Sequence, residues 1–315
     1  MSTSKTTSLA EVRSRERISG LPDLRRLSNA SFGFLMVLPA LLLLLAIFVY
    51  PLAFSAYMSF HAFDLARPQD FESVGLQNYS TIIQSEEFLR ALKNTLIYVG
   101  LAVPVEFVLG LILALALANI QRGRAVLRTL LTTPMMLAPT AMGLMWKFMY
   151  NDQLGVISHV IRQLGINPPL WLADPNLALY SVVIVDIWAT TPLIILLMLA
   201  GLLSIPHEYY EAAKIDGAGL IGIFRRITLP LLRPVILVGL LLRGMDAFRV
   251  FDIIFVMTKG GPAMRSDVLS FFAYRQMFTH RAVGDATSTA WIMTMMLLVA
   301  GLVLIRLMRR QGESQ

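Results

Sequence analysis

Four charged residues interrupt the apolar run 231–257 at a spacing of three: Arg243, Asp246, Arg249 and Asp252. An ionisable side chain near the centre of a bilayer costs about 2.5–3.5 kcal/mol, so such groups face protein or a water-filled path. On a helix, residues three apart lie on neighbouring turns, where opposite charges can pair. Two interpretations remain open, an ion-pair ladder that orients the helix and a polar wall for a hydroxylated substrate. Other apolar runs also contain charges, namely Glu106, Lys147 and Asp186.

The sequence carries no residue set typical of an enzyme or a metal site. It contains no cysteine, and its four histidines are scattered, so thiol chemistry and thiolate metal sites are excluded. We find no Ser, His and Asp that can be placed together as a catalytic set. No G-x-x-x-x-G-K-[ST] motif is present, so this chain does not cradle ATP phosphates by that route. If this protein depends on ATP, the subunit that hydrolyses ATP is therefore another polypeptide.

Composition and apolar runs predict an integral membrane protein. The chain is 56% hydrophobic and 15% charged, whereas soluble domains carry roughly 25% charged residues. A membrane-spanning helix needs about 20 mostly apolar residues. Six runs qualify, and the third of them, 128–149, is interrupted by Pro134, Pro139 and Lys147, where we expect kinks. The six runs are 32–58, 93–119, 128–149, 179–203, 231–257 and 286–308.

The distribution of Lys and Arg predicts the topology. Of the 27 Lys and Arg, 16 flank the side that would be cytoplasmic and 9 the opposite side; Arg243 and Arg249 make up the remainder. This bias places both termini in the cytoplasm. The positive charge lies in short flanks beside apolar runs, so it indicates membrane topology and not nucleic-acid binding.

We expect a basic cytoplasmic tail at 1–30, a six-helix domain at 31–309 and a short cytoplasmic tail at 310–315. The outer segments 59–92, 150–178 and 258–285 should form short helices and turns.

The inner segment 204–230 is predicted to form a short helix, a turn and a second short helix. Pro206 suits the first turn of a helix, and Glu208 favours its positive end. Gly217 can end this helix in a left-handed conformation. The second helix would run from 220 to 228 and lead into the fifth apolar run. Such a rigid element, held at the membrane surface with one side free, can transmit motion from a soluble partner.

The same segment resembles a known family. Glu211-Ala212-Ala213 is followed after three residues by Gly217 and later by Ile227 and Leu229-Pro230. This spacing resembles the EAA loop of bacterial ABC-importer permeases, which forms a coupling helix in a cleft of the ATP-binding subunit. The resemblance assigns the coupling role to Glu211, Ala212, Ala213, Asp216, Gly217, Leu229 and Pro230.

Three further elements are similar to the carbohydrate permeases of the maltose and trehalose type. They are Gly75 to Tyr79, Asp186 to Pro192, and Asp246 to Asp252 with Gly260-Gly261-Pro262. The resemblance implies an all-α integral membrane protein with six transmembrane helices, the type I ABC importer permease fold. It implies a bacterial inner-membrane location, a carbohydrate substrate and no catalytic role. The implied partners are a second homologous permease, an ATP-binding subunit dimer that holds ATP and Mg, and an extracytoplasmic solute-binding protein.

The resemblance also suggests which residues line the substrate path. Maltose-type permeases have asparagines at some of the matching positions, where this chain has Asp186, Ala247 and Val250, which argues against maltose itself. An alternative function is an ion-coupled secondary carrier for a small polar solute, which would use buried carboxylates for proton coupling. The small number of spans and the EAA spacing argue against a carrier. The full predicted path is Asp186, Trp188, Ala189, Thr190, Arg243, Asp246, Ala247, Arg249 and Val250.

Overall fold

The computed structural model describes residues 29–120 and 122–312, which divide into two compact units, 1–54 and 55–315. The predicted tail at 1–30 lies outside the described residues except for its last two, and of the predicted tail at 310–315 residues 310–312 belong to α14 and the rest lie outside. The first unit consists of α1 (Asn29–Leu44), the π-helical turn η3 (Leu45–Val49) and the start of α2 (Tyr50–Ser59). Apart from Leu38, the side chains from 33 to 54 are exposed. A helix so apolar and so exposed suits contact with lipid.

After the end of α2, the second unit forms a β-hairpin, which the all-α prediction missed. Strands β1 (His61–Asp64) and β2 (Arg67–Ser73) pair antiparallel, and α3 (Gln77–Gln84) follows. His61 stacks on Phe71 with ring centroids 4.7 Å apart. The Asn78 amide of α3 donates to the carbonyls of Ser59 and His61 at 3.0 and 2.9 Å. Cross-strand aromatic stacking and this amide stabilise a hairpin where the sequence predicted only helices and turns.

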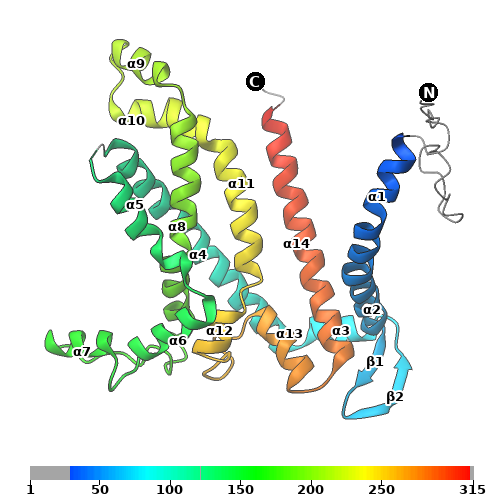
Figure 1. Cartoon of the computed structure of the whole chain (residues 1–315). Coiled ribbons are helices and arrows are strands. Elements are labelled where there is room, and N and C mark those ends of the chain that lie inside the picture. The colour runs from blue at the N-terminus through cyan, green and yellow to red at the C-terminus, as the bar shows by residue number, and fades with distance from the viewer. Residues whose placement is uncertain (1–28, 121, 313–315) are drawn as a thin grey trace, which may run out of the picture. The chain divides into compact units, whose positions relative to one another are not determined.

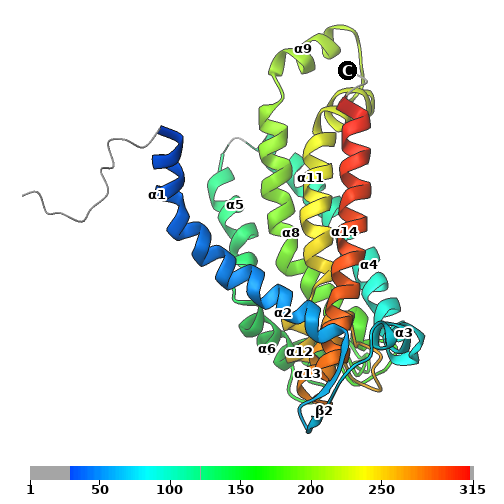
Figure 2. The same ribbon diagram turned by 90° about the vertical axis from the view of Figure 1, so that its right-hand side faces the viewer.

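Long helices form the body of this unit. They are α4 (Glu86–Asn119), α8 (Ala178–Ser204), α11 (Leu229–Phe248) and α14 (Val283–Gly312). Helix α4 starts at Glu86, seven residues before the predicted run 93–119. Ser85 caps it by accepting a hydrogen bond from the Phe88 amide at 3.2 Å. Figure 2 shows α8, α11 and α14 running alongside one another. The core is the apolar layer between α4 and α8, with Tyr98, Val182 and Met198 fully buried.

A glycine permits the close packing of α4 on α8. A Cβ placed on Gly110 would lie 2.6 Å from Cγ2 and 2.8 Å from Cβ of Ile194, whereas one on Gly100 would meet nothing within 4 Å. We therefore expect Gly110→Ala to lower the free energy of unfolding by about 1–3 kcal/mol, the usual cost of overpacking. Gly100→Ala on the same helix is the matched control. Thermal unfolding of the purified protein in detergent compares the two, and equal midpoints would contradict the packing role of Gly110.

The third predicted span is broken. It consists of α5 (Arg124–Thr132), the 3₁₀ turn η4 (Thr133–Met136) and α6 (Pro139–Met149). Leu137 and Ala138 between them are extended. Proline lacks a backbone N–H and disfavours helix in the preceding residue. The α-helix changes to a 3₁₀ turn at Pro134, and Ala138 before Pro139 is extended, so both predicted kinks are confirmed. As a result, five helices among the described residues are long and apolar enough to cross a membrane, and the count of six is not reproduced as six continuous helices.

The two ends of the second unit carry different short elements (Figure 1). One end has α9 (His207–Ile215), α10 (Leu220–Ile223) and the π-helical turn η5 (Phe224–Thr228). The other end has α7 (Val156–Gln163), α12 (Asp252–Met257) and α13 (Leu269–Phe278). The fifth predicted run is divided here, because α11 ends at Phe248 and α12 begins only at Asp252. The Lys147 ammonium donates to the Val256 carbonyl of α12 at 3.0 Å and so ties α6 to α12.

Candidate functional site

A buried arginine lies at the centre of the candidate site. Arg243 of α11 is 2% exposed. Its Nε donates to Oε2 of Glu106 at 2.7 Å, and its Nη2 donates to Oε1 at 2.9 Å. Glu106 of α4 is fully buried. This two-bond geometry is the strong, planar form of an arginine–carboxylate pair, and it joins α11 to α4.

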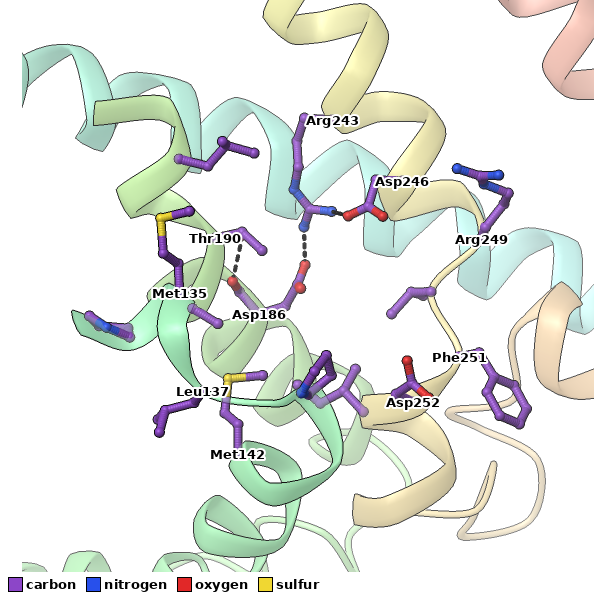
Figure 3. A pocket seen from close by; sticks show the side chains of 16 residues that line it. Met135, Leu137, Met142, Asp186, Thr190, Arg243, Asp246, Arg249, Phe251 and Asp252 are labelled. Atoms are coloured by element: carbon purple, nitrogen blue, oxygen red, sulfur yellow. Dashed lines mark hydrogen bonds and ion pairs between the residues drawn. The ribbon is translucent and has the colours of Figure 1, made fainter. Parts of the chain in front are cut away.

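Two further carboxylates share the same guanidinium. Asp186 of α8 accepts from Nη2, and Asp246 of α11 accepts from Nη1 at 2.9 Å. The hydroxyl of Thr190 donates to Oε1 of Glu106 at 2.7 Å. In Figure 3 the side chains of Asp186 and Asp246 point toward Arg243 from two different helices. One guanidinium therefore cross-links α4, α8 and α11.

The predicted ion-pair ladder is correct for its first pair only. Arg243 and Asp246 pair as expected, but α11 ends at Phe248, so the helical spacing does not continue. Arg249 is exposed, and its Nε donates to the Met245 carbonyl at 3.2 Å. Asp252 starts α12 and is also exposed. The main partners of Arg243 come instead from α4 and α8, which no spacing within one segment reveals.

A cavity of about 280 Å³ opens beside this cluster. Its walls come from α8, from the end of α11 and start of α12, and from the broken segment η4–α6 (Figure 3). Seven of the predicted path residues line it: Asp186, Ala189, Thr190, Arg243, Asp246, Arg249 and Val250. Their role in substrate passage remains a prediction.

Two predicted path residues lie elsewhere. Trp188 is absent from the lining and packs edge-on against Trp146, with ring centroids 5.3 Å apart. Ala247 is fully buried in the core. Trp188 is two residues from both Asp186 and Thr190, so it points to another side of α8, because only every third or fourth residue of a helix points to the same side.

Sequence reasoning missed one complete wall of the cavity. The broken third segment contributes Pro134, Met135, Leu137, Pro139 and Met142. A pair of prolines within an apolar run was the available signal, because irregular backbone at membrane depth is tolerated where it is buried in protein or lines a cavity.

Glu106 was recognised as a buried charge without a function. It is the only carboxylate in the run 93–119, and that isolation was the signal for a buried partner.

The predicted coupling segment has the expected local structure. Gly217 has φ +73°, in the left-handed region that glycine favours. Its amide donates to the Lys214 carbonyl at 3.1 Å, and the Ala218 amide donates to the Ala213 carbonyl at 2.9 Å. These two bonds are the Schellman motif, which closes the C-terminus of α9. Pro230 stands in the first turn of α11.

One side of the coupling segment is free among the described residues. Ile215, Leu220 and Ile221 are 86%, 85% and 75% exposed. Ala213 is buried, whereas Glu211, Ala212 and Asp216 are exposed. Exposed apolar side chains grouped on one rigid element are typical of a protein-binding surface.

Comparison with known proteins gives the family. Residues 79–313 match the model of the binding-protein-dependent transport system inner membrane component. The chain belongs to this family. It is therefore a multi-pass inner-membrane permease component, and it is not itself catalytic.

Named relatives cover most of the permease. It is 39% identical over 78% of its length to the trehalose/maltose transport system permease protein MalF of Thermococcus litoralis, of which 83% is covered. It is 33% identical over 90% of its length to the sulfoquinovosyl glycerol transport system permease protein SmoG of Agrobacterium fabrum, of which 92% is covered. Among solved structures, a chain of a bacterial alginate ABC transporter in complex with its periplasmic protein is 26% identical, with a TM-score of 0.77 over 88% of this permease and 94% of that chain.

At the end of the permease opposite α9, polar contacts fix the loop after α12 to α4. The Asn94 amide donates to the Asp267 carbonyl at 2.8 Å, and the Thr95 hydroxyl accepts from the Leu269 amide at 2.9 Å. Asp267 is buried and pairs with Arg275 at 2.8 Å. Burial raises the pKa of Asp267 to about 6, although the charge of Arg275 acts in the opposite direction. The loop that contains Gly260-Gly261-Pro262 is thus held firmly on the helix that carries Glu106.

Proposed function

We propose that this permease forms half of the translocation path of an ATP-driven importer for a sugar, a sugar derivative or a polyol. The observation that carries the proposal is the coupling segment 204–230. It is a short helix closed by a Schellman motif, with exposed Ile215, Leu220 and Ile221 at its turn. The sequence has no phosphate-binding loop of its own, so this segment is its connection to an energy source. Relatives whose names specify trehalose, maltose and sulfoquinovosyl glycerol support the sugar class.

The partners follow from this arrangement. An ATP-binding subunit dimer, which holds ATP and Mg, docks on Glu211 to Gly217 and the exposed apolar side chains beside them. A second homologous permease completes the path, and an extracytoplasmic solute-binding protein delivers substrate to the end that carries α7, α12 and α13. Both termini then lie in the cytoplasm.

The mechanism is alternating access. Closure of the ATPase dimer moves α9 and, through η5, the start of α11. Arg243 on α11 cross-links α4 and α8, so the three helices move together as one body. The cavity wall on this body then separates from or approaches the broken segment η4–α6. Hydrolysis of ATP resets the cavity toward the cytoplasm.

Uptake into vesicles tests the energy source. The complete transporter is reconstituted with its binding protein, and uptake of trehalose and of a panel of sugars is measured with ATP or with a proton gradient. ATP-dependent uptake supports the importer. Uptake that follows the proton gradient alone contradicts it and favours the ion-coupled carrier.

Asp246 provides a test of the substrate path. Its side chain is 69% exposed, and it makes one bond to Arg243, which keeps two other carboxylate partners. Asp246→Ala should therefore leave the assembled transporter intact. It should lower ATP-driven uptake about tenfold or more, because a hydrogen bond to a charged group contributes about 1.5–3 kcal/mol. Asp70→Ala, in the exposed strand β2, is the control. Normal uptake by Asp246→Ala would reduce this residue to a scaffold role.

A further inference from the structure

Arg243 is not available to bind an anion. A guanidinium has five N–H donors. Four hydrogen bonds already run from Arg243 to carboxylates of Glu106, Asp186 and Asp246. Its positive charge is therefore neutralised within the protein, and these hydrogen bonds fix the orientation of its guanidinium group.

The accessible charges of the cavity are mainly acidic. Asp246 is 69% exposed and uses one oxygen for Arg243. Asp252 is exposed, and within the described residues its carboxylate has no ion-pair partner. Both line the cavity. Arg249 is the remaining cation of the lining, and in Figure 3 its guanidinium lies away from the Arg243 cluster.

The balance of formal charge is negative. The cluster and cavity bring together four carboxylates, Glu106, Asp186, Asp246 and Asp252, and two guanidiniums, Arg243 and Arg249. The formal excess is thus two negative charges, and one remains even if a proton is shared between buried carboxylates. A cleft with walls of low dielectric constant focuses such a field and concentrates ligands of the opposite sign.

We propose that this cavity admits hydroxylated ligands that are uncharged or cationic and excludes anionic ones, with Asp246 and Asp252 as the residues that determine this preference. That the ligand is a sugar or sugar-like solute rests on the function proposed above. The carboxylate oxygens left free accept hydrogen bonds from hydroxyl or ammonium groups, whereas a carboxylate or sulfonate on the ligand meets like charge. The fold does not set the preference, because a transporter of the acidic polysaccharide alginate has the same fold; the side chains set it.

The absence of cysteine in the sequence permits a direct measurement of this field. Val250→Cys places a single thiol on the cavity wall, and Leu193→Cys provides a second, independent reporter. Each full-length variant, in permeabilised membranes, is treated with two methanethiosulfonate reagents of similar size, one bearing a trimethylammonium group and one a sulfonate. The thiolate attacks the reagent sulfur, a mixed disulfide forms and sulfinate leaves. The ionised fraction of the thiol affects both rates equally, so their ratio reports the local potential.

We expect the ratio of cationic to anionic rates at either reporter to exceed that of Leu154→Cys by at least tenfold. Leu154 is 91% exposed and lies outside the cavity. Asp246→Asn and Asp252→Asn, each added to a reporter, should lower the ratio, and Arg249→Gln should raise it. A ratio at or below that of Leu154→Cys, a ratio insensitive to both Asn substitutions, or reporters unreactive to both reagents would each overturn the proposal.

This measurement needs neither ATP nor transport. Failed ATP-driven uptake would therefore refute the importer function and leave the charge preference standing. A reversed reagent ratio would refute the charge preference and leave the importer function standing.

Discussion

Replacing Arg243 with methionine is expected to lower the free energy of unfolding by about 3–5 kcal/mol, the usual cost of removing one partner from a buried ion pair. The substitution leaves the carboxylates of Glu106 and Asp186 unpaired, with side chains 0% and 9% exposed. It also removes the side chain that joins α11 to both α4 and α8 within this cluster. We expect a much lower midpoint of thermal unfolding in detergent and a smaller yield of inserted protein.

Two comparisons make this result specific. Arg249→Met removes an exposed arginine with a backbone contact, and its effect on stability should stay within about 0.5 kcal/mol. The triple variant Glu106→Gln, Asp186→Asn, Arg243→Met removes all the buried charges of this cluster and should regain much of the lost stability, because the penalty comes from unpaired charge. An Arg243→Met midpoint equal to that of Arg249→Met would contradict the cross-linking role.

Replacing Gly217 with valine is expected to uncouple ATP hydrolysis from transport. At φ +73° a Cβ would meet nothing within 4 Å, so the obstacle is the backbone conformation and not space. A left-handed conformation costs an L-residue about 1–2 kcal/mol. The Schellman closure would then be lost in a large share of molecules, and coupling should fall about tenfold. The measurement is substrate-stimulated ATPase activity of the reconstituted transporter.

The control variants separate backbone strain from side-chain chemistry. Gly217→Asn should keep most of the coupling, because asparagine tolerates the left-handed region better than other non-glycine residues. Gly219→Val adds the same side chain two residues away, at φ −73° and in open space, and should cause little change. Full coupling in Gly217→Val, or equal losses in Gly217→Val and Gly219→Val, would show that the closure of α9 is not required.

Local features were predictable to the residue. Gly217 in the left-handed conformation, the short helix on each side of it, and the breaks at Pro134 and Pro139 all appear where the sequence placed them. Each depends on interactions within about five residues, namely a missing Cβ, a missing N–H or a closing hydrogen bond. The β-hairpin at 61–73 was missed because no strict alternation of polar and apolar residues marks it.

By itself, the sequence determined that the chain spans a membrane, that segment 204–230 contains a short helix ended by Gly217, and that its buried charges require partners. Only the tertiary structure decided which partners those are. Glu106 and Asp186 lie 137 and 57 residues from Arg243 in the chain, and helical periodicity gives no information across such distances. The ladder along 243–252 fails because α11 ends at Phe248. Asp246, in the last turn of α11, and Asp252, at the start of α12, instead line one cavity together with the proline-broken segment. Buried charge requires neutralisation at close range, but packing between helices determines which charges are near.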